Sequence, residues 1–319
     1  MDPRMTIDTT QESDLDRALA YVRPAIRRQK PYLVGGTEEP RVKLNQNESP
    51  YDLPVELKRE LVEAFLAIPF NRYPQEQPWA LRQALAEHVG HDPDGILVGN
   101  GSNELTYTLG LTLVAPGSPV VLPRPMFSLY ESVVRMHDGD LISIPPRPDL
   151  SFDVDAVRAA VATRDPALTV LTTPNNPTGL ALPLSDVESV VAAARGFVVV
   201  DEAYVEFSEE ESAQAILDRY PNLILLRTMS KACGLAGLRV GYLMGHPAVV
   251  AELFTARLPF MIDRMAETTA LALLARPALL AYRTHLKHRP PCRRSPEQET
   301  WHRPPDTDHP LRRRLHRPT

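Results

Sequence analysis

Apolar residues recur every three or four positions in the first part of the chain. Leu57, Leu61 and Phe65, for example, fall near one face if their segment is helical. This spacing is typical of an amphipathic α-helix that covers a core. It predicts helices over residues 14–26, 54–68 and 78–89.

Beyond residue 95 the pattern changes to short, continuous apolar runs. These runs are bounded by Pro, Gly, Asn or Asp, and they cover residues 96–98, 120–122, 168–172, 198–200 and 223–226. Continuous apolar runs of this length are typical of strands that are buried on both faces. Helix-like segments separate several of them, over residues 103–114, 126–136 and 184–194.

This alternation predicts an α/β fold, with a mostly parallel (mixed) sheet covered by helices on both faces. In such a sheet, ligands bind beyond the carboxyl ends of the strands. The residues that follow each apolar run are therefore the first candidates for a functional site.

Composition agrees with a globular protein of this kind. The chain has 319 residues, 43% hydrophobic and 24% charged, which is enough for one large domain and a smaller one. Two cysteines exclude a disulfide framework and a multi-cysteine zinc site, and we expect no metal. No apolar run reaches the roughly 18 residues that cross a bilayer, and the acidic N-terminal segment lacks the apolar stretch of a secretory signal. We therefore expect a cytoplasmic protein without a membrane partner.

Residues 283–319 have a different composition from the rest of the chain. They hold ten of the 35 Lys and Arg but four of the 40 Asp and Glu, so their net charge is +6 and that of residues 1–282 is −11. Such a segment cannot bury enough apolar area to offset its chain entropy, and it predicts an aberrant, disordered Pro/Arg/His-rich tail. We interpret the abrupt change as a shifted reading frame. A nucleic-acid-binding arm is the alternative, but the acidic remainder of the chain disfavours it, and we expect no nucleic-acid partner.

Chemically distinctive residues follow four of the apolar runs. Gly101, Ser102 and Asn103 follow the first run and open a helix, which is typical of an anion site as well as of a plain tight turn. Residues 174–179 follow the third run and read Pro-Asn-Asn-Pro-Thr-Gly, which indicates a loop.

A carboxylate and an amine follow the last two runs. Asp201 ends an all-apolar strand, where it needs a cation or a proton donor, or else caps a helix. Lys231 is flanked by Ser230 and small residues, and a desolvated lysine with a lowered pKa can bond an aldehyde. Together, the four positions supply what pyridoxal 5′-phosphate (PLP) needs: a phosphate cradle, an acid for the ring nitrogen, hydrogen bonds for the phenolic oxygen, and an amine.

At these residues the chain resembles the fold-type I PLP-dependent aminotransferases, in particular the histidinol-phosphate aminotransferase branch. The resemblance extends over about residues 15–280 and is closest at residues 44–50, 72–74, 174–179, 201–204 and 230–242. It implies the PLP-transferase type I fold with an incomplete second, small domain. The implied divisions are an N-terminal arm and start of the small domain (1–50), a large PLP-binding domain (51–255), the start of a C-terminal small domain (256–282) and the aberrant tail (283–319).

The resemblance also implies roles for residues around the cofactor ring. Lys231 resembles the lysine that bonds the cofactor aldehyde and then moves a proton. Asp201 resembles the acid that keeps the ring nitrogen protonated. Asn176 and Tyr204 are similar to the pair that binds the ring oxygen, and Phe127 to the aromatic residue that stacks on the ring.

The remaining implied contacts lie around the phosphate and the substrate. The phosphate-site positions are Gly101, Ser102, Asn103, Ser230 and Arg239. Tyr73 resembles a tyrosine that reaches the cofactor phosphate of a partner subunit, which implies a homodimer. Tyr32 and Asn47 resemble substrate contacts.

For this branch the implied reaction transfers an amino group between an amino donor and a 2-oxo acid. The expected pair is L-histidinol phosphate and 2-oxoglutarate, in histidine biosynthesis. An aromatic amino-acid aminotransferase, an enzyme like the threonine-phosphate decarboxylases, and a non-catalytic PLP-binding remnant are the alternatives. The family continues past residue 283 into a domain whose arginine binds the substrate carboxylate or phosphate, and residues 283–319 do not match it. We therefore expect impaired activity.

Overall fold

The computed structural model describes residues 9–31 and 43–285. Its centre is a seven-stranded sheet in the order β1-β7-β6-β5-β4-β2-β3. β7 runs antiparallel to β1 and β6, and the other neighbours are parallel, so the predicted mixed, mostly parallel sheet is confirmed. The strands are β1 (Ile96–Asn100), β2 (Pro119–Pro123), β3 (Asp140–Ile144), β4 (Leu168–Thr172), β5 (Phe197–Asp201), β6 (Leu223–Thr228) and β7 (Val240–Met244).

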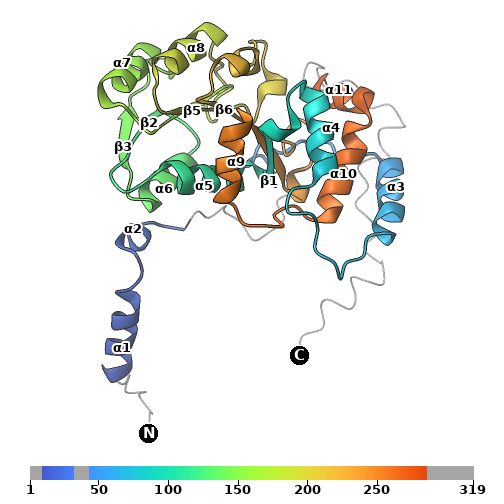
Figure 1. Ribbon diagram of the computed structural model, residues 1–319, viewed down its shortest axis with the longest axis horizontal. Helices are drawn as coiled ribbons and strands as arrows, with labels where there is room; N and C mark the ends of the chain where they lie inside the picture. Colours follow the sequence, from blue (N-terminus) through green and yellow to red (C-terminus); the bar gives the residue numbers. More distant parts are fainter. Residues whose placement is uncertain (1–8, 32–42, 286–319) are drawn as a thin grey trace.

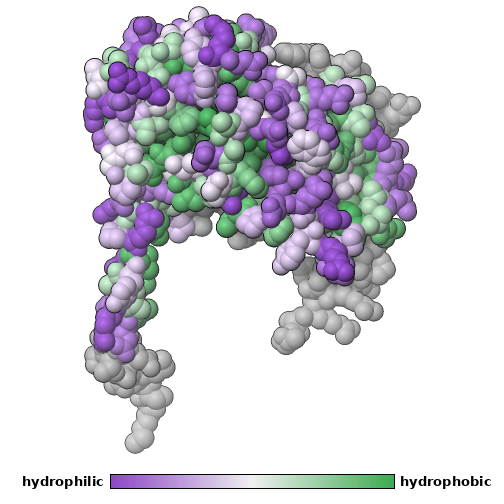
Figure 2. Space-filling model, viewed as in Figure 1, coloured by the Kyte–Doolittle hydropathy of each residue, from purple (hydrophilic) through white to green (hydrophobic). Residues whose placement is uncertain are grey.

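Helices cover both faces of this sheet. Figure 1 shows α7 and α8 on one side of the strands and α5 and α6 on the other, while α3, α4, α10 and α11 gather beyond β1. The helices are α1 (Thr9–Leu19), α2 (Pro24–Arg27), α3 (Val55–Leu66), α4 (Trp79–Val89), α5 (Gly101–Leu113), α6 (Leu129–Met136), α7 (Val154–Arg164), α8 (Leu184–Ala193), α9 (Pro247–Thr255), α10 (Arg264–Leu274) and α11 (Pro277–His285). Hydrophilic residues predominate over the outer helices α7 and α8 in the view of Figure 2, and hydrophobic residues are seen between the helical layers.

The sequence prediction did not include α7, α9, α10 and α11, and three further elements differ from it for a local reason. The helix expected over 14–26 is two helices, α1 and α2, because Pro24 has no N–H group and begins the second one. β3 was not predicted because it lies at the edge of the sheet, where only Ile144 is buried. β7 was not predicted because its apolar residues directly follow a segment rich in glycine.

The expected domain boundaries at 50/51 and 255/256 fall in loops before α3 and after α9. α10, which follows the second boundary, packs against α3 and α4, and the division into domains stays a prediction. The expected start of the tail at residue 283 falls inside α11, where Arg283 is buried and donates hydrogen bonds to two backbone carbonyls. The rest of the predicted tail, 286–319, lies outside the described residues. Within the described ranges no helix is long and apolar enough to cross a membrane.

A buried ion pair joins the carboxyl ends of β5 and β6. Glu202 is 1% exposed, and its Oε2 accepts hydrogen bonds from Arg227 Nε at 2.9 Å and Nη2 at 2.8 Å. The Ser212 hydroxyl lies within 2.9 Å of both partners, and the Ala213 N–H donates to Glu202 Oε1 at 2.8 Å. Each oxygen of the carboxylate is therefore satisfied, which a buried charge requires.

Removing one member of this pair will cost more stability than removing both charges. We expect Arg227→Met to lower the free energy of unfolding by about 3–5 kcal/mol, because it leaves the Glu202 charge buried and unpaired. The double variant Glu202→Gln/Arg227→Met will lose less. Urea denaturation of the apoprotein measures both, with Arg219→Met, which breaks a surface pair to Glu188, as the control. A double variant no more stable than Arg227→Met would contradict this account.

Candidate active site

A cavity of about 580 Å³ lies at the carboxyl ends of the parallel strands. Ten of the thirteen predicted site residues line it: Asn47, Ser102, Asn103, Phe127, Asn176, Asp201, Tyr204, Ser230, Lys231 and Arg239. They come together because β4, β5 and β6 run in the same direction, with Asp201 paired to Thr172 and to Leu226 in the sheet. Residues distant in sequence thereby reach one edge of the sheet.

The Asp201 carboxylate is held by two hydrogen bonds at the base of the cavity. The Tyr130 hydroxyl donates to Oδ2 at 2.7 Å and the Ala203 N–H to Oδ1 at 3.0 Å. Burial raises the pKa of Asp201, whereas the Tyr130 hydrogen bond opposes that rise. Such a carboxylate favours a ligand group that brings a positive charge or a proton.

Tyr130 was not predicted as a site residue. It follows Phe127 by three positions, and this proximity to a predicted residue is the only signal in the sequence that points to it. Asn175 was also missed. Its amide donates to Pro125 O at 2.8 Å and to Thr178 Oγ1 at 3.0 Å, and these bonds hold the loop that carries Asn176.

The Lys231 amine faces the cavity from the turn after β6. Its Nζ donates to the carbonyl oxygen of Gln46 at 2.6 Å and lies 5.6 Å from the centre of the Tyr204 ring. Burial lowers the pKa of Lys231, which favours the neutral, nucleophilic amine. Cys233, two residues further on, is no competing nucleophile because burial raises the pKa of its thiol to about 12.

The segment before α3 forms the wall of the cavity that faces Lys231. Asn47 Nδ2 donates to the Tyr204 hydroxyl at 3.1 Å. Asn47 has a φ of 52°, a left-handed conformation that asparagine tolerates better than most residues. Tyr204, predicted to bind the ring oxygen, and Asn47, predicted to contact the substrate, are therefore joined by a hydrogen bond.

The other end of the cavity forms an anion cradle. The N-terminus of α5 presents Ser102 and Asn103, and Arg239 stands over it from the turn before β7. A Cβ atom on Gly101 would lie 2.2 Å from Arg239 Nη2, so glycine is what lets the guanidinium approach. A Cβ on Gly241 would likewise lie 2.3 Å from the Ser102 nitrogen, so β7 and the start of α5 pack with no room for a side chain.

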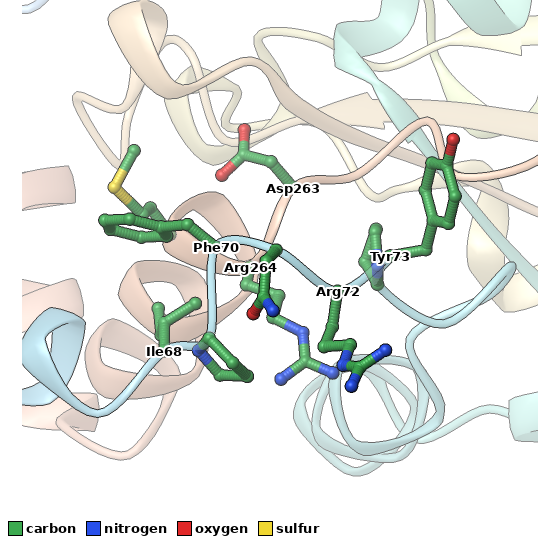
Figure 3. A pocket seen from close by; sticks show the side chains of 10 residues that line it. Ile68, Phe70, Arg72, Tyr73, Asp263 and Arg264 are labelled. Carbon is green, nitrogen blue, oxygen red and sulfur yellow. The ribbon is translucent and has the colours of Figure 1, made fainter.

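The structure does not bring Tyr73 to this cavity. Its side chain is 79% exposed, stacks on Phe260 with ring centres 4.8 Å apart, and lines a second cavity of about 470 Å³. Figure 3 shows Tyr73 and the arginines Arg72 and Arg264 in that cavity, with both guanidinium groups pointing the same way. Tyr32 lies outside the described residues.

The groups of the first cavity fit PLP. The cradle of helix N–H groups, Ser230 and Arg239 suits a phosphate, because backbone donors and a planar cation face one point. Asp201 suits a protonated ring nitrogen, and Lys231 an aldehyde. Within residues 9–31 and 43–285, no group of three or more His, Cys, Asp or Glu side chains is arranged to hold a metal ion.

Comparison with known proteins agrees with this geometry. Residues 39–289 match the aminotransferase class I and II family. The histidinol-phosphate aminotransferase of Chlorobaculum parvum is 42% identical over 266 residues, which are 83% of this chain and 75% of the relative. That of Chlorobaculum tepidum is 45% identical over 251 residues, which are 79% of this chain and 72% of the relative.

A solved structure has the same fold. The histidinol-phosphate aminotransferase of Sinorhizobium meliloti, determined in complex with PLP, superposes with a TM-score of 0.70 at 30% identity. The match covers 75% of this chain and 65% of that chain, so this chain spans slightly less than two thirds of the solved protein.

Replacing Tyr130 by Phe will change how stability depends on pH. Burial raises the pKa of Asp201 above its ordinary value of 3.8, so the folded apoprotein holds this proton more tightly than the unfolded chain does. The resulting stabilisation is present at low pH and is lost as the pH rises through the raised pKa. In Tyr130→Phe the pKa rises further, so the loss will extend to higher pH.

The free energy of unfolding of the apoprotein, measured against pH, tests this. Tyr220→Phe, which removes a similar hydrogen bond to Glu188 at the surface, is the control. Parallel curves for wild type and Tyr130→Phe would show that the hydroxyl does not act on Asp201.

Proposed function

Because the chain belongs to the class I and II aminotransferase family, we propose that it transfers the amino group of L-histidinol phosphate to 2-oxoglutarate. The family implies an amino donor and a 2-oxo acid as substrates and PLP as cofactor. The Chlorobaculum relatives, named histidinol-phosphate aminotransferases at 42% and 45% identity, support this choice of donor. The cavity that joins Lys231, Asp201 and an anion cradle is the observation that carries the reaction class.

PLP, when bound, supplies an aldehyde that exchanges amines and a ring that accepts the electron pair left when the substrate loses its α-proton. The phosphate would be held by Ser102, Asn103, Ser230 and Arg239. The ring would lie beside Phe127, with Asn176 and Tyr204 at its oxygen.

Lys231 is the residue that we propose moves the proton. Its lowered pKa favours a neutral amine, which can take the proton from the α-carbon of the substrate. The amine would then deliver this proton to the carbon atom that came from the PLP aldehyde. The Gln46 carbonyl, 2.6 Å from Nζ, accepts a hydrogen bond from the amine and keeps it facing the cavity.

Asp201 would hold the proton of the ring nitrogen. A carboxylate fixed by Tyr130 and Ala203 cannot rotate away, so its charge stays directed at one point of the cavity. Asn47, which contacts Tyr204, is our proposed substrate contact in the described part of the chain, together with Tyr32 outside it. A cytoplasmic location remains a prediction from the sequence.

The function is tested by following L-glutamate production from histidinol phosphate and 2-oxoglutarate. We expect wild-type protein with PLP to produce glutamate and Lys231→Ala to lose at least about 10³-fold in turnover, because no other amine takes over the proton transfer. Lys58→Ala, an exposed lysine paired with Asp52, is the control. Glutamate production by Lys231→Ala at the wild-type rate would refute the role of Lys231. Wild-type protein that binds PLP but converts phenylalanine or threonine phosphate instead would refute the donor.

We also propose that the protein is a homodimer whose second copy covers the Tyr73 cavity. Exposed apolar side chains line this cavity: Tyr73 is 79% exposed, Phe70 76% and Met265 40%. Clustered exposed apolar residues are typical of an interface. The guanidinium groups of Arg72 and Arg264 point the same way, away from the Tyr73 ring (Figure 3), so this face also suits an anionic group brought by the partner.

Placing a charge on this face will separate the subunits. We expect light scattering to give twice the mass of one chain for wild type, and one chain for Phe70→Asp, because the aspartate must be desolvated in the interface. Leu150→Asp, at an exposed loop beyond β3, will stay dimeric. A monomeric wild type, or a dimeric Phe70→Asp, would place the interface elsewhere or remove it.

A further inference from the structure

Arg283 lies at a junction of three chain segments beside the active site. It is 7% exposed and comes from α11, the last helix of the described chain. Its Nη1 donates to the carbonyl oxygen of Asp52 at 3.0 Å and its Nη2 to that of Tyr51 at 2.8 Å. One planar guanidinium thus joins two successive carbonyls, which an ammonium group cannot do in the same way.

The same guanidinium lies against the turn that follows Lys231. A Cβ atom on Gly234 would lie 1.9 Å from Arg283 Nη2 and 3.3 Å from the Tyr51 oxygen. Gly234 has a φ of 68° and donates its N–H to the Lys231 carbonyl at 3.0 Å, which closes the turn. Glycine is therefore required here both by the backbone conformation and by the approach of Arg283.

Both segments that meet Arg283 continue directly into the active site. Residues 46 and 47, a few positions before Tyr51, supply the carbonyl that accepts from Lys231 and the amide that donates to Tyr204. The turn over residues 231–234 begins with Lys231 itself. Residues 43–54 form no helix or strand in the described structure, so side-chain contacts hold this wall of the cavity in place.

We propose that Arg283 is a positioning residue of the active site, which clamps the 46–52 segment to the 231–234 turn and thereby sets the wall that faces Lys231. It acts through Tyr51, Asp52 and Gly234 and does not touch the cofactor. The inference rests on the proposed function in one respect only, that Lys231 is the cofactor lysine.

The test compares Arg283→Met with Arg276→Met. Arg276 lies just before α11 and pairs with Glu60 at the surface, so it controls for loss of an arginine near the same helix. We expect PLP to dissociate about tenfold more readily from Arg283→Met than from Arg276→Met, since two charge-assisted hydrogen bonds near the lysine are lost. Absorbance titration of the apoprotein with PLP measures this without turnover.

Amide hydrogen exchange separates positioning from general destabilisation. In Arg283→Met we expect faster exchange in peptides that contain residues 46–52 and 231–235, with β4 and β5 as protected as in Arg276→Met. A merely structural role would speed exchange throughout the sheet. A uniform increase in exchange rate throughout the sheet would overturn the proposal. Equal PLP affinity in Arg283→Met and Arg276→Met would overturn it as well.

A double-mutant cycle with Gly234→Ala tests the contact itself. In wild type the new methyl group strikes Arg283, whereas in Arg283→Met only the backbone strain at Gly234 remains. We therefore expect Gly234→Ala to weaken PLP binding by a larger factor in wild type than in Arg283→Met. Equal factors would overturn the clamp.

A milder variant keeps the proposal testable if Arg283→Met does not fold. Arg283→Lys retains the charge but reaches one carbonyl only. We therefore expect its PLP affinity and its amide exchange rates to lie between those of wild type and those of a protein that lacks both hydrogen bonds. Arg283→Lys indistinguishable from Arg276→Met would overturn the proposal. None of these readouts depends on the amino donor, so failure of histidinol phosphate as substrate would leave them unchanged.

Discussion

The relative placement of Asp201 and Lys231 depends on the buried ion pair between Glu202 and Arg227. Glu202 directly follows β5, and Arg227 lies four residues before Lys231, near the end of β6. The Glu202 N–H also donates to the Leu226 carbonyl at 2.8 Å, which continues the ladder between the strands. If either strand end slipped by one residue, a charge would lose its partner in a place that water hardly reaches. The ion pair therefore fixes the register between β5 and β6, and with it the relative positions of Asp201 and Lys231.

The same pair influences the charge that the cavity presents. Burial raises the pKa of Asp201, and the nearby Glu202 carboxylate adds to that rise. Glu202 is itself paired with Arg227, and the Tyr130 hydroxyl donates the hydrogen bond that favours the ionised form of Asp201. A carboxylate can thus remain at the end of an apolar strand, where its charge matters most for a cationic ligand group.

How much of this structure the sequence predicts depends on how far apart along the chain the interacting residues lie. Strands such as β6 were predictable because burial on both faces leaves a continuous apolar run, and Lys231 was predictable because it follows one. β3 was not, since an edge strand is only partly buried. Tyr130 and Arg283 were missed for a different reason. Their partners lie 71 residues away at Asp201 and 231 residues away at Asp52, and such pairings leave no local pattern.

The two ends of the cavity are consequently held in place by different interactions. The anion cradle is fixed to the sheet, since a side chain at Gly241 in β7 would strike the start of α5, and one at Gly101 would strike Arg239. The wall that faces Lys231 consists of irregular chain, whose ordering costs about 1–2 kcal/mol per residue in backbone entropy. A few polar contacts, those of Asn47, the Gln46 carbonyl and Arg283, must offset that cost. The cradle will therefore tolerate changes elsewhere in the chain that the lysine-facing wall will not. Although α11 contributes no group to the cavity, it helps to shape the cavity through Arg283.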